Sequence, residues 1–344
     1  MPVLRSRGSP RRTGWCYEYR RAAGRIVIAL SCRRPWYGGG GGPIADEEWF
    51  QDAFEEHRRA LHAHCYRLAG NVADADDLVQ ETFLRGWRSR TQYAGRASIR
   101  TWLYRIATNV YLDQRKAAAR RTVPVGDPME WSTEIGPYPD ALLGQDPPSD
   151  LVARETVELA LIAALMYLPP RQRAAFVLRD VSGWTPAEIA DALELAVPAV
   201  NSLIQRARKT LRHYAPGDSR HWRRPVLTAE DEEVLRRYAA AVDPASFKEL
   251  LAEDVRITMP PDPAICGIEA AAEFLGRAMD WRTFPSAANG RPALICYLRR
   301  PGSDWYDATV VDVLTIENGF IVESNAFVGA HHILAFGLPA SIEA

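Results

Sequence analysis

The sequence predicts a multi-domain protein, with two all-α domains followed by a C-terminal α+β domain. Residues 74–121 and 155–212 carry apolar side chains at helical spacing, and a proline-rich segment separates the two stretches. After residue 225 the pattern changes to short helices and then to strands, the last two joined by the hairpin-forming pair Asn318-Gly319. A chain of 344 residues accommodates two or three such domains.

The composition is that of a globular protein, with 47% hydrophobic and 25% charged residues. The five cysteines show no paired spacing, which indicates a reduced, cytoplasmic protein without a disulfide framework. No apolar run approaches the length of a membrane span, so no membrane partner is expected.

Residues 1–43 hold nine arginines and a single acidic residue, Glu18. The apolar stretch 26–30 is too short for a signal peptide. We predict a disordered basic extension and assign it no function.

Residues 44–121 form the first predicted domain. It opens with a helical pair of apolar character around Trp49, Phe50 and Leu61. The run His62-Ala63-His64-Cys65 invites a metal site, but nothing nearby completes a ligand set at zinc-like spacing. We interpret these side chains as packing residues and predict neither a metal nor a cofactor.

The predicted helix 74–88 carries a leucine in the middle of a charged face. Val79, Thr82 and Gly86 mark its packed side. The outward side then consists of Asp77, Gln80, Glu81, Leu84 and Arg88. An apolar anchor among charges is typical of a protein-binding surface, although an ordinary exposed leucine has the same pattern.

The predicted helix 98–120 has an apolar stripe through Leu103, Ala107 and Val110. Basic residues and aromatics interleave on the opposite side, which suits a nucleic-acid backbone with unstacked bases. That side carries Arg100, Tyr104, Arg105, Thr108, Tyr111, Arg115 and Lys116.

The first domain contains the segment DADDLVQETFLRGW, the loop YAGRAS and the predicted helix IRTWLYRIATNVYLDQR. Together these segments resemble region 2 of bacterial extracytoplasmic-function sigma factors of the sigma-70 family. The resemblance is dense over residues 61–121. It implies that core RNA polymerase binds Asp77, Gln80, Glu81 and Leu84. It also implies that the promoter −10 element lies against Arg100, Tyr104, Asn109, Tyr111 and Arg115.

Residues 122–153 contain no lysine or arginine and are rich in proline and glycine. This composition predicts an acidic linker without its own core. From the residues alone, the linker is expected to be a solvated tether. The resemblance implies that such a linker runs through the polymerase active-site cleft.

Residues 154–215 predict a helix-turn-helix. Thr185 and Glu188 have the spacing of a capping box, with Pro186 at the first helical position. A second helix follows, buried along Val200, Ile204 and Ala207, which would enter the major groove. Its outward residues are Asn201, Ser202, Gln205, Arg206, Lys209 and Arg212.

Residues 168–212 resemble sigma region 4, which implies that this outward face recognises the promoter −35 element. Two residues depart from the family pattern. Glu194 stands where the turn favours glycine, because a left-handed backbone suits glycine best. Ala196 cannot cap the second helix through its side chain.

Residues 228–340 predict helices at 230–242, 245–251 and 266–279, and strands near 255–258, 292–299, 304–317 and 320–328. The run LLAEDVRITMPP, with the glycine, helix and strands after it, resembles the cone-shaped SnoaL-like domain that some of these sigma factors carry. Such a cone encloses a pocket, and Asp312 alternates onto an apolar face there. The aspartate fits a pocket carboxylate or a hydrogen-bonded structural residue.

Three function classes remain open at this stage. The leading one is a promoter-recognising polymerase subunit, whose partners are core RNA polymerase and promoter DNA. The second is a helix-turn-helix regulator fused to a SnoaL-like small-molecule-binding domain, and the third a SnoaL-like enzyme with a DNA-binding part. We expect no catalysis and a C-terminal domain that regulates activity, with an unknown small ligand as its candidate effector.

Overall fold

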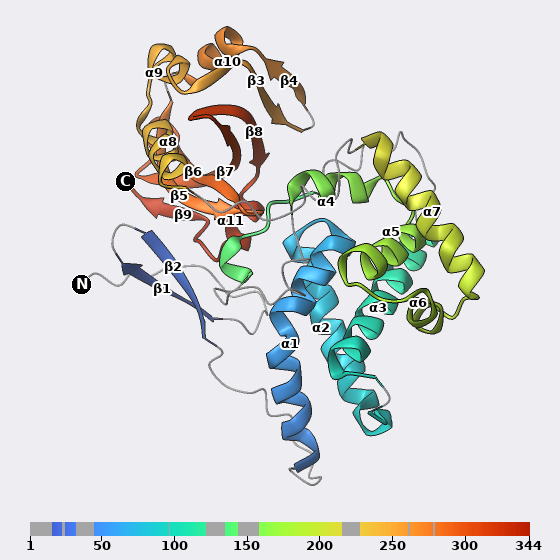
Figure 1. Cartoon of the computed structure of the whole chain (residues 1–344). Helices are drawn as coiled ribbons and strands as arrows, with labels where there is room; N and C mark the ends of the chain where they lie inside the picture. The colour runs from blue at the N-terminus through green and yellow to red at the C-terminus, as the bar shows by residue number, and fades with distance from the viewer. Residues whose placement is uncertain are drawn as a thin grey trace. The chain divides into compact units, whose positions relative to one another are not determined.

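The computed structural model describes residues 16–22, 25–31, 45–95, 97–121, 135–143, 158–214, 228–260, 262–277 and 279–344. The chain divides into two compact units (Figure 1). One comprises Pro43–Val226, and the other comprises Met1–Gly42 with Leu227–Ala344. No helix in the described part of the chain is both long and apolar enough to cross a membrane.

The first unit begins with the helices α1 (Ala45–Ala69), α2 (Val72–Ser89) and α3 (Ile99–Arg121), with a 3-10 turn η1 (Arg90–Gln92) after α2. The sharp turn into α2 uses Gly70 at φ 94°. Asn71 then caps α2 by accepting a hydrogen bond from the backbone N–H of Asp74 at 2.8 Å. Rings of Phe50, Phe54 and Phe83 pack between the helices with centroids 5.0–6.0 Å apart.

The second half of this unit contains η3 (Asp140–Leu142), α4 (Leu159–Met166), α5 (Pro170–Phe176), the π-helical turn η5 (Val177–Val181), α6 (Pro186–Leu193) and α7 (Val197–Tyr214). The predicted capping box is confirmed: Thr185 Oγ1 accepts from the Glu188 N–H at 3.2 Å, and Glu188 accepts from the Thr185 N–H at 2.7 Å. Glu194 adopts the left-handed conformation, at φ 54°. The helix-turn-helix therefore forms in spite of this unfavourable turn residue.

The second unit contains α8 (Ala229–Ala240), α9 (Pro244–Lys248), α10 (Ile268–Leu275) and α11 (Ala330–Ala335). Its strands are β3 (Leu251–Met259), β4 (Asp262–Cys266), β5 (Asp280–Ala288), β6 (Arg291–Arg299), β7 (Trp305–Glu317), β8 (Phe320–Val328) and β9 (Ser341–Glu343). The sheet order is β4-β3-β8-β7-β6-β5, with β9 paired to β7. Only β3 and β8 run parallel among these pairs.

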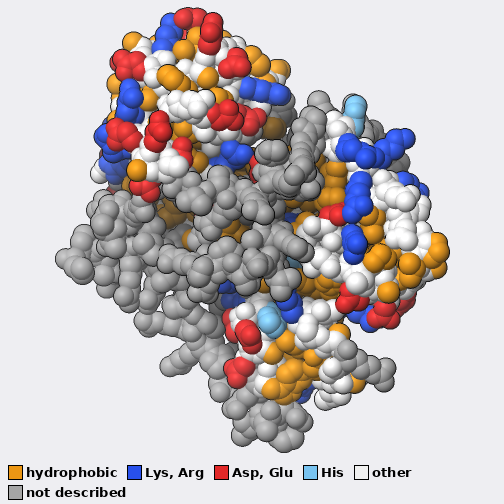
Figure 2. Space-filling model, viewed as in Figure 1, with side chains coloured by type: hydrophobic (Ala, Val, Ile, Leu, Met, Phe, Trp, Pro, Cys, Tyr) orange, Lys and Arg blue, Asp and Glu red, His pale blue; other side chains and the backbone are white. Residues whose placement is uncertain are grey.

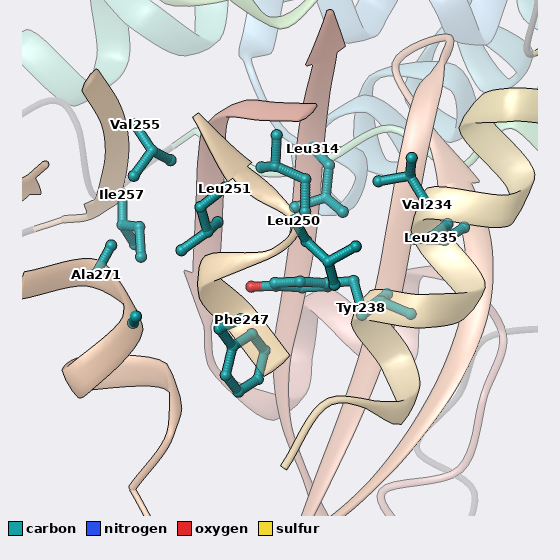
Figure 3. Close-up of a cluster of buried hydrophobic side chains, with 13 residues drawn as sticks. Val234, Leu235, Tyr238, Phe247, Leu250, Leu251, Val255, Ile257, Ala271 and Leu314 are labelled. Carbon is teal, nitrogen blue, oxygen red and sulfur yellow. The ribbon is translucent and has the colours of Figure 1, made fainter. Parts of the chain in front are cut away.

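The sheet curves strongly around its helices (Figure 1). One apolar cluster fills the space that α8, α9 and α10 close against the sheet, and Figure 3 shows Tyr238, Phe247 and Leu314 converging there. A second cluster packs α11 against strands β5, β6 and β7. The predicted α+β cone is confirmed, and apolar side chains occupy the interior at the first cluster.

Several expectations need correction. The predicted disordered extension contains an antiparallel hairpin, β1 (Cys16–Ala22) paired with β2 (Arg25–Ser31). The β-branched and aromatic residues of these stretches favour strands in spite of the arginines among them. In the second unit the sequence reading missed β4, β5, α11 and β9, which are short or irregular in polarity.

Candidate nucleic-acid interface

Helix α2 presents the predicted outward face. Asp77, Gln80 and Leu84 are exposed, and Leu84 shows 39% of its surface. Partial burial and the neighbouring carboxylates of Asp74 and Asp76 raise the pKa of Asp77. Glu81 is only half-exposed, because it accepts a 2.8 Å hydrogen bond from Arg85. The face thus combines an exposed leucine with acidic groups.

Helix α3 differs from the prediction at its aromatic residues. Tyr104 and Tyr111 are 2% and 1% exposed, so their predicted outward position is wrong. The Tyr104 hydroxyl donates to the Ala60 carbonyl at 3.1 Å, and its ring stacks on His64 at 4.4 Å. Helix α3 packs against both α1 and α5, so one apolar stripe does not describe its buried surface. Thr108 is buried for the same reason.

The polar members of the α3 set remain accessible. Arg100, Asn109 and Arg115 are half-buried. The Arg100 guanidinium lies 5.2 Å from the Tyr104 ring centroid, and that of Arg115 lies 5.7 Å from the Tyr111 ring. The buried tyrosines therefore support the arginines from beneath.

Sequence reasoning missed a group of half-exposed aromatic rings beside the loop 93–98. Trp49 stacks on Tyr93 with centroids 5.9 Å apart, and Tyr93 lies 5.1 Å from Trp102. Near them the Arg90 guanidinium sits 4.1 Å over the Trp87 ring. These residues come from α1, α2, η1 with the loop after it, and α3, so no single periodic pattern could have gathered them.

Helix α7 presents its predicted polar face. Asn201, Ser202, Gln205, Arg206, Lys209 and Arg212 are all exposed, while Val200, Ile204, Ala207 and Leu211 are buried. Figure 2 shows basic side chains gathered over the region of α7. Arg208 pairs with Asp180 and so fixes α7 to the π-helical turn η5.

The histidines of α1 make hydrogen bonds within the unit. His62 Nδ1 lies 2.8 Å from the Tyr138 hydroxyl, and His62 Nε2 lies 3.1 Å from an Asp76 oxygen. His64 Nε2 lies 3.0 Å from Thr108 Oγ1, and burial lowers the pKa of His64 to about 3. Within the described ranges no three His, Cys, Asp or Glu side chains are placed to hold a metal ion.

Part of the predicted linker is packed rather than solvated. Residues 136–139 are buried, and the Tyr138 ring packs at a tilt against the Tyr66 ring of α1, with centroids 4.5 Å apart. The Gly136 N–H donates to the Gly70 carbonyl at 3.0 Å. The prediction of a solvated tether is therefore wrong for this stretch, because the aromatic side chain of Tyr138 packs against the first unit. The acidic residues Asp127, Glu130, Glu134, Asp146 and Asp150 lie outside the described residues.

Asp312 of β7 is buried with two hydroxyl partners. Ser324 Oγ lies 2.7 Å from one carboxylate oxygen, and the Tyr238 hydroxyl lies 3.1 Å from the other. Burial raises the pKa of Asp312, and the two hydrogen bonds oppose that rise. A shallow groove of about 280 Å³ on this unit is lined by Leu251, Glu253 and Phe320 among others, but not by Asp312.

The chain matches two family models, Sigma-70 region 2 over residues 53–121 and Sigma-70 region 4 over residues 158–211. These models cover the two helical parts just described, so the first unit is that of a sigma factor. The chain is 37% identical over 311 residues to the ECF RNA polymerase sigma factor SigG of Mycobacterium tuberculosis, covering 84% of this chain and 83% of the relative. The protein belongs to the extracytoplasmic-function RNA polymerase sigma factors.

Two further comparisons agree. The chain is 39% identical over 159 residues to the ECF RNA polymerase sigma factor SigJ of M. tuberculosis, covering 46% of this chain and 48% of the relative. The crystal structure of SigJ aligns with a TM-score of 0.53 at 23% identity, over 83% of this chain and 98% of that one. That alignment supports the fold, with two helical sigma domains followed by a C-terminal SnoaL-like domain.

Proposed function

We propose that the sigma-factor function of this chain is divided among three surfaces. The outward face of α2, with Asp77, Gln80, Glu81 and Leu84, binds core RNA polymerase. The α7 residues Asn201, Ser202, Gln205, Arg206, Lys209 and Arg212 bind the −35 element. On α3, Arg100, Asn109 and Arg115 line the −10 element, with Tyr104 and Tyr111 supporting the arginines.

The exposed polar face of α7 carries this assignment most directly. The helix is buried along one side only, and the ion pair between Arg208 and Asp180 fixes it to η5. A rigid helix with amide and basic side chains suits base edges and phosphates. The half-exposed rings of Trp49, Tyr93 and Trp102 offer stacking surfaces for unpaired −10 bases.

The test is transcription reconstituted with core polymerase on a promoter that contains both elements. Because polymerase is a cytoplasmic enzyme, we propose that the chain acts there. Start-site-specific transcripts that depend on the chain support the division. Transcripts that survive simultaneous charge reversal of Arg206, Lys209 and Arg212 refute the role of α7.

We also propose that the SnoaL-like domain regulates the sigma domains and is not an enzyme. The Asp312 carboxyl is held by Ser324 and Tyr238 within a filled apolar interior, so it serves structure. An unidentified small ligand remains the candidate effector. If removing the domain changes the yield of open complexes, regulation is supported. If the chain turns over a small ketone and Asp312→Asn abolishes that turnover, catalysis is supported instead.

A further inference from the structure

Arg85 of α2 connects carboxylates on two different helices. Its Nε donates a hydrogen bond to Oε1 of Glu81, one turn earlier in α2, at 2.8 Å. Its Nη1 donates to Oδ2 of Asp113 in α3 at 2.7 Å. One guanidinium therefore joins the proposed polymerase-binding face of α2 to the helix that carries the proposed −10 residues.

These ion pairs contribute little to holding the two helices together. Helices α2 and α3 pack on each other, and both carry almost fully buried apolar side chains, such as Leu78, Leu103 and Val110. The side chains of Arg85 and Asp113 are 37% and 60% exposed. Ion pairs as exposed as these stabilise a fold only weakly. The precise geometry of the bridge is better explained by what it does at the surface.

The bridge fixes the position of the Glu81 carboxylate. A Cβ added at Gly86 would lie 2.8 Å from Cζ of Phe50, so α2 packs tightly against α1 directly beside Arg85. The backbone of Arg85 is held by this packing, and its guanidinium is held by Asp113. Glu81 accepts its hydrogen bond from a donor that is fixed at both ends. A glutamate without such a donor samples several rotamers.

The bridge also keeps this end of the α2 face acidic. A pair of Glu81 and Arg85 alone would be neutral, and a neutral pair attracts a charged partner poorly. With Asp113 included, two carboxylates share one guanidinium, which leaves a net charge of −1. The exposed Asp77 adds to the same charge one turn away. An acidic face of this kind is complementary to a basic surface on the partner.

We infer that Arg85 and Asp113 are positioning residues for polymerase binding: Asp113 holds Arg85, and Arg85 holds the Glu81 carboxylate towards a basic group of core polymerase. The inference rests on the proposed role of the α2 face. Neither positioning residue has to contact polymerase itself. Ordering one flexible side chain during association weakens binding by about 2- to 12-fold, a loss that a side chain fixed beforehand avoids.

The main test is a double-mutant cycle on the binding of the full chain to core polymerase, measured by fluorescence anisotropy. Glu81→Gln should weaken binding about ten-fold. Asp113→Asn should weaken it about five-fold. Because Asp113 acts through Glu81, the double variant should bind no more weakly than Glu81→Gln alone. If the double variant instead loses about 50-fold, the product of the separate effects, Asp113 acts independently and the inference is overturned.

A second set of variants tests the geometry of the bridge. Arg85→Lys keeps the charge but lacks the fork of donors that reaches both carboxylates, so binding should weaken about five-fold. Asp113→Glu keeps a carboxylate and should bind within about two-fold of the unmodified chain. Arg236→Lys is the matched control, because Arg236 donates to Glu233 at 2.9 Å on α8, outside the sigma regions. It should leave binding unchanged.

Denaturant unfolding of the same variants separates positioning from stability. Asp113→Asn should keep the unfolding midpoint of the unmodified chain. A lowered midpoint, together with equally weak binding by Asp113→Glu and Asp113→Asn, would assign Asp113 to stability and overturn the inference. If Leu84→Arg weakens binding but Glu81→Gln does not, the proposed face stands and the positioning role fails. If neither variant weakens binding, the proposed polymerase-binding face itself fails.

Discussion

Leu84 is the residue through which the polymerase-binding proposal is tested most simply. It is exposed at the centre of the α2 face, so Leu84→Arg should weaken binding to core polymerase without unfolding the chain. Loss of an apolar anchor that becomes desolvated at an interface typically costs about 2 kcal/mol or more, roughly 30-fold in Kd. The measurement is a titration of core polymerase by fluorescence anisotropy. Leu334→Arg is the matched control, because Leu334 is another exposed leucine, 48% exposed, outside the sigma regions.

Gln205 and Lys209 share the exposed face of α7 but differ in chemistry. Lys209→Ala should weaken binding at every promoter sequence and reduce its salt dependence, as loss of a phosphate contact does. Gln205→Ala should instead change which −35 sequences are preferred, because an amide reads base edges. Binding to a library of −35 variants at two salt concentrations separates the two effects. Equal losses at every sequence for both variants would contradict this division.

His64 should make the unfolding free energy of the helical unit depend on pH, with a sign that follows from its lowered pKa. Its pKa is about 3 in the folded chain against 6.5 for an ordinary histidine, so the unfolded state binds the extra proton between these values. The unfolding free energy should therefore rise with pH from about 3 to 6.5, by up to about 1.36 kcal/mol per pH unit. Denaturant unfolding followed by circular dichroism should show a shallower slope in His64→Gln. An identical slope in both proteins would mean that His64 is not the source.

Asp312 should have the opposite effect on the pH dependence of stability in the SnoaL-like domain. Burial raises its pKa, so the folded state holds the proton more tightly and stability falls as pH rises above the carboxyl's usual range. Asp312→Asn keeps the shape and can still hydrogen-bond Ser324 and Tyr238, and should remove this loss. The check is hydrogen exchange of β7 and β8 between pH 5 and 8. If Asp312→Asn destabilises these strands as much as Asp312→Ala does, the carboxyl is charged in the folded state.

At the scale of elements, helices with one apolar stripe and standard caps were predictable. The α7 stripe, the capping box of α6 and the hairpin turn at Asn318 all appear as local patterns, and the structure confirms each. Helix α3 was harder, because a helix packed on two sides buries Tyr104 and Tyr111 on what the single-stripe pattern assigns to solvent. The accessibility of Arg100 and Arg115 on the proposed −10 surface could be predicted, but the burial of Tyr104 and Tyr111 beneath them could not.

Contacts between distant segments could not be predicted. Tyr138 lies in a proline-rich stretch whose composition indicates a tether, yet His62, Tyr66 and Gly70 together create its binding site. Arg173 is a single cation in sequence and becomes the link between α1 and α4 only through tertiary packing. The strand β4 and the edge strand β9 are short and take their structure from their neighbours.

At the scale of the whole molecule, the unit that holds the SnoaL-like domain takes up the chain at Leu227. A chain ending at residue 227 should keep the helical content of the sigma domains and change open-complex yield, because a tethered domain acts at high effective concentration. Full-length and shortened chains are compared at equal concentration in one transcription assay. Indistinguishable yield and promoter choice would contradict regulation by the SnoaL-like domain.

Start-site mapping in a reconstituted system tests the central claim most directly. Core polymerase, the full chain and a library of genomic promoter fragments are combined, and transcript 5′ ends are sequenced. We predict start sites that appear only with the chain present, share −10 and −35 sequences upstream, and disappear with Leu84→Arg but not with Leu334→Arg. Start sites that are independent of the chain, or equally abundant with both variants, would contradict a sigma factor that binds polymerase through α2.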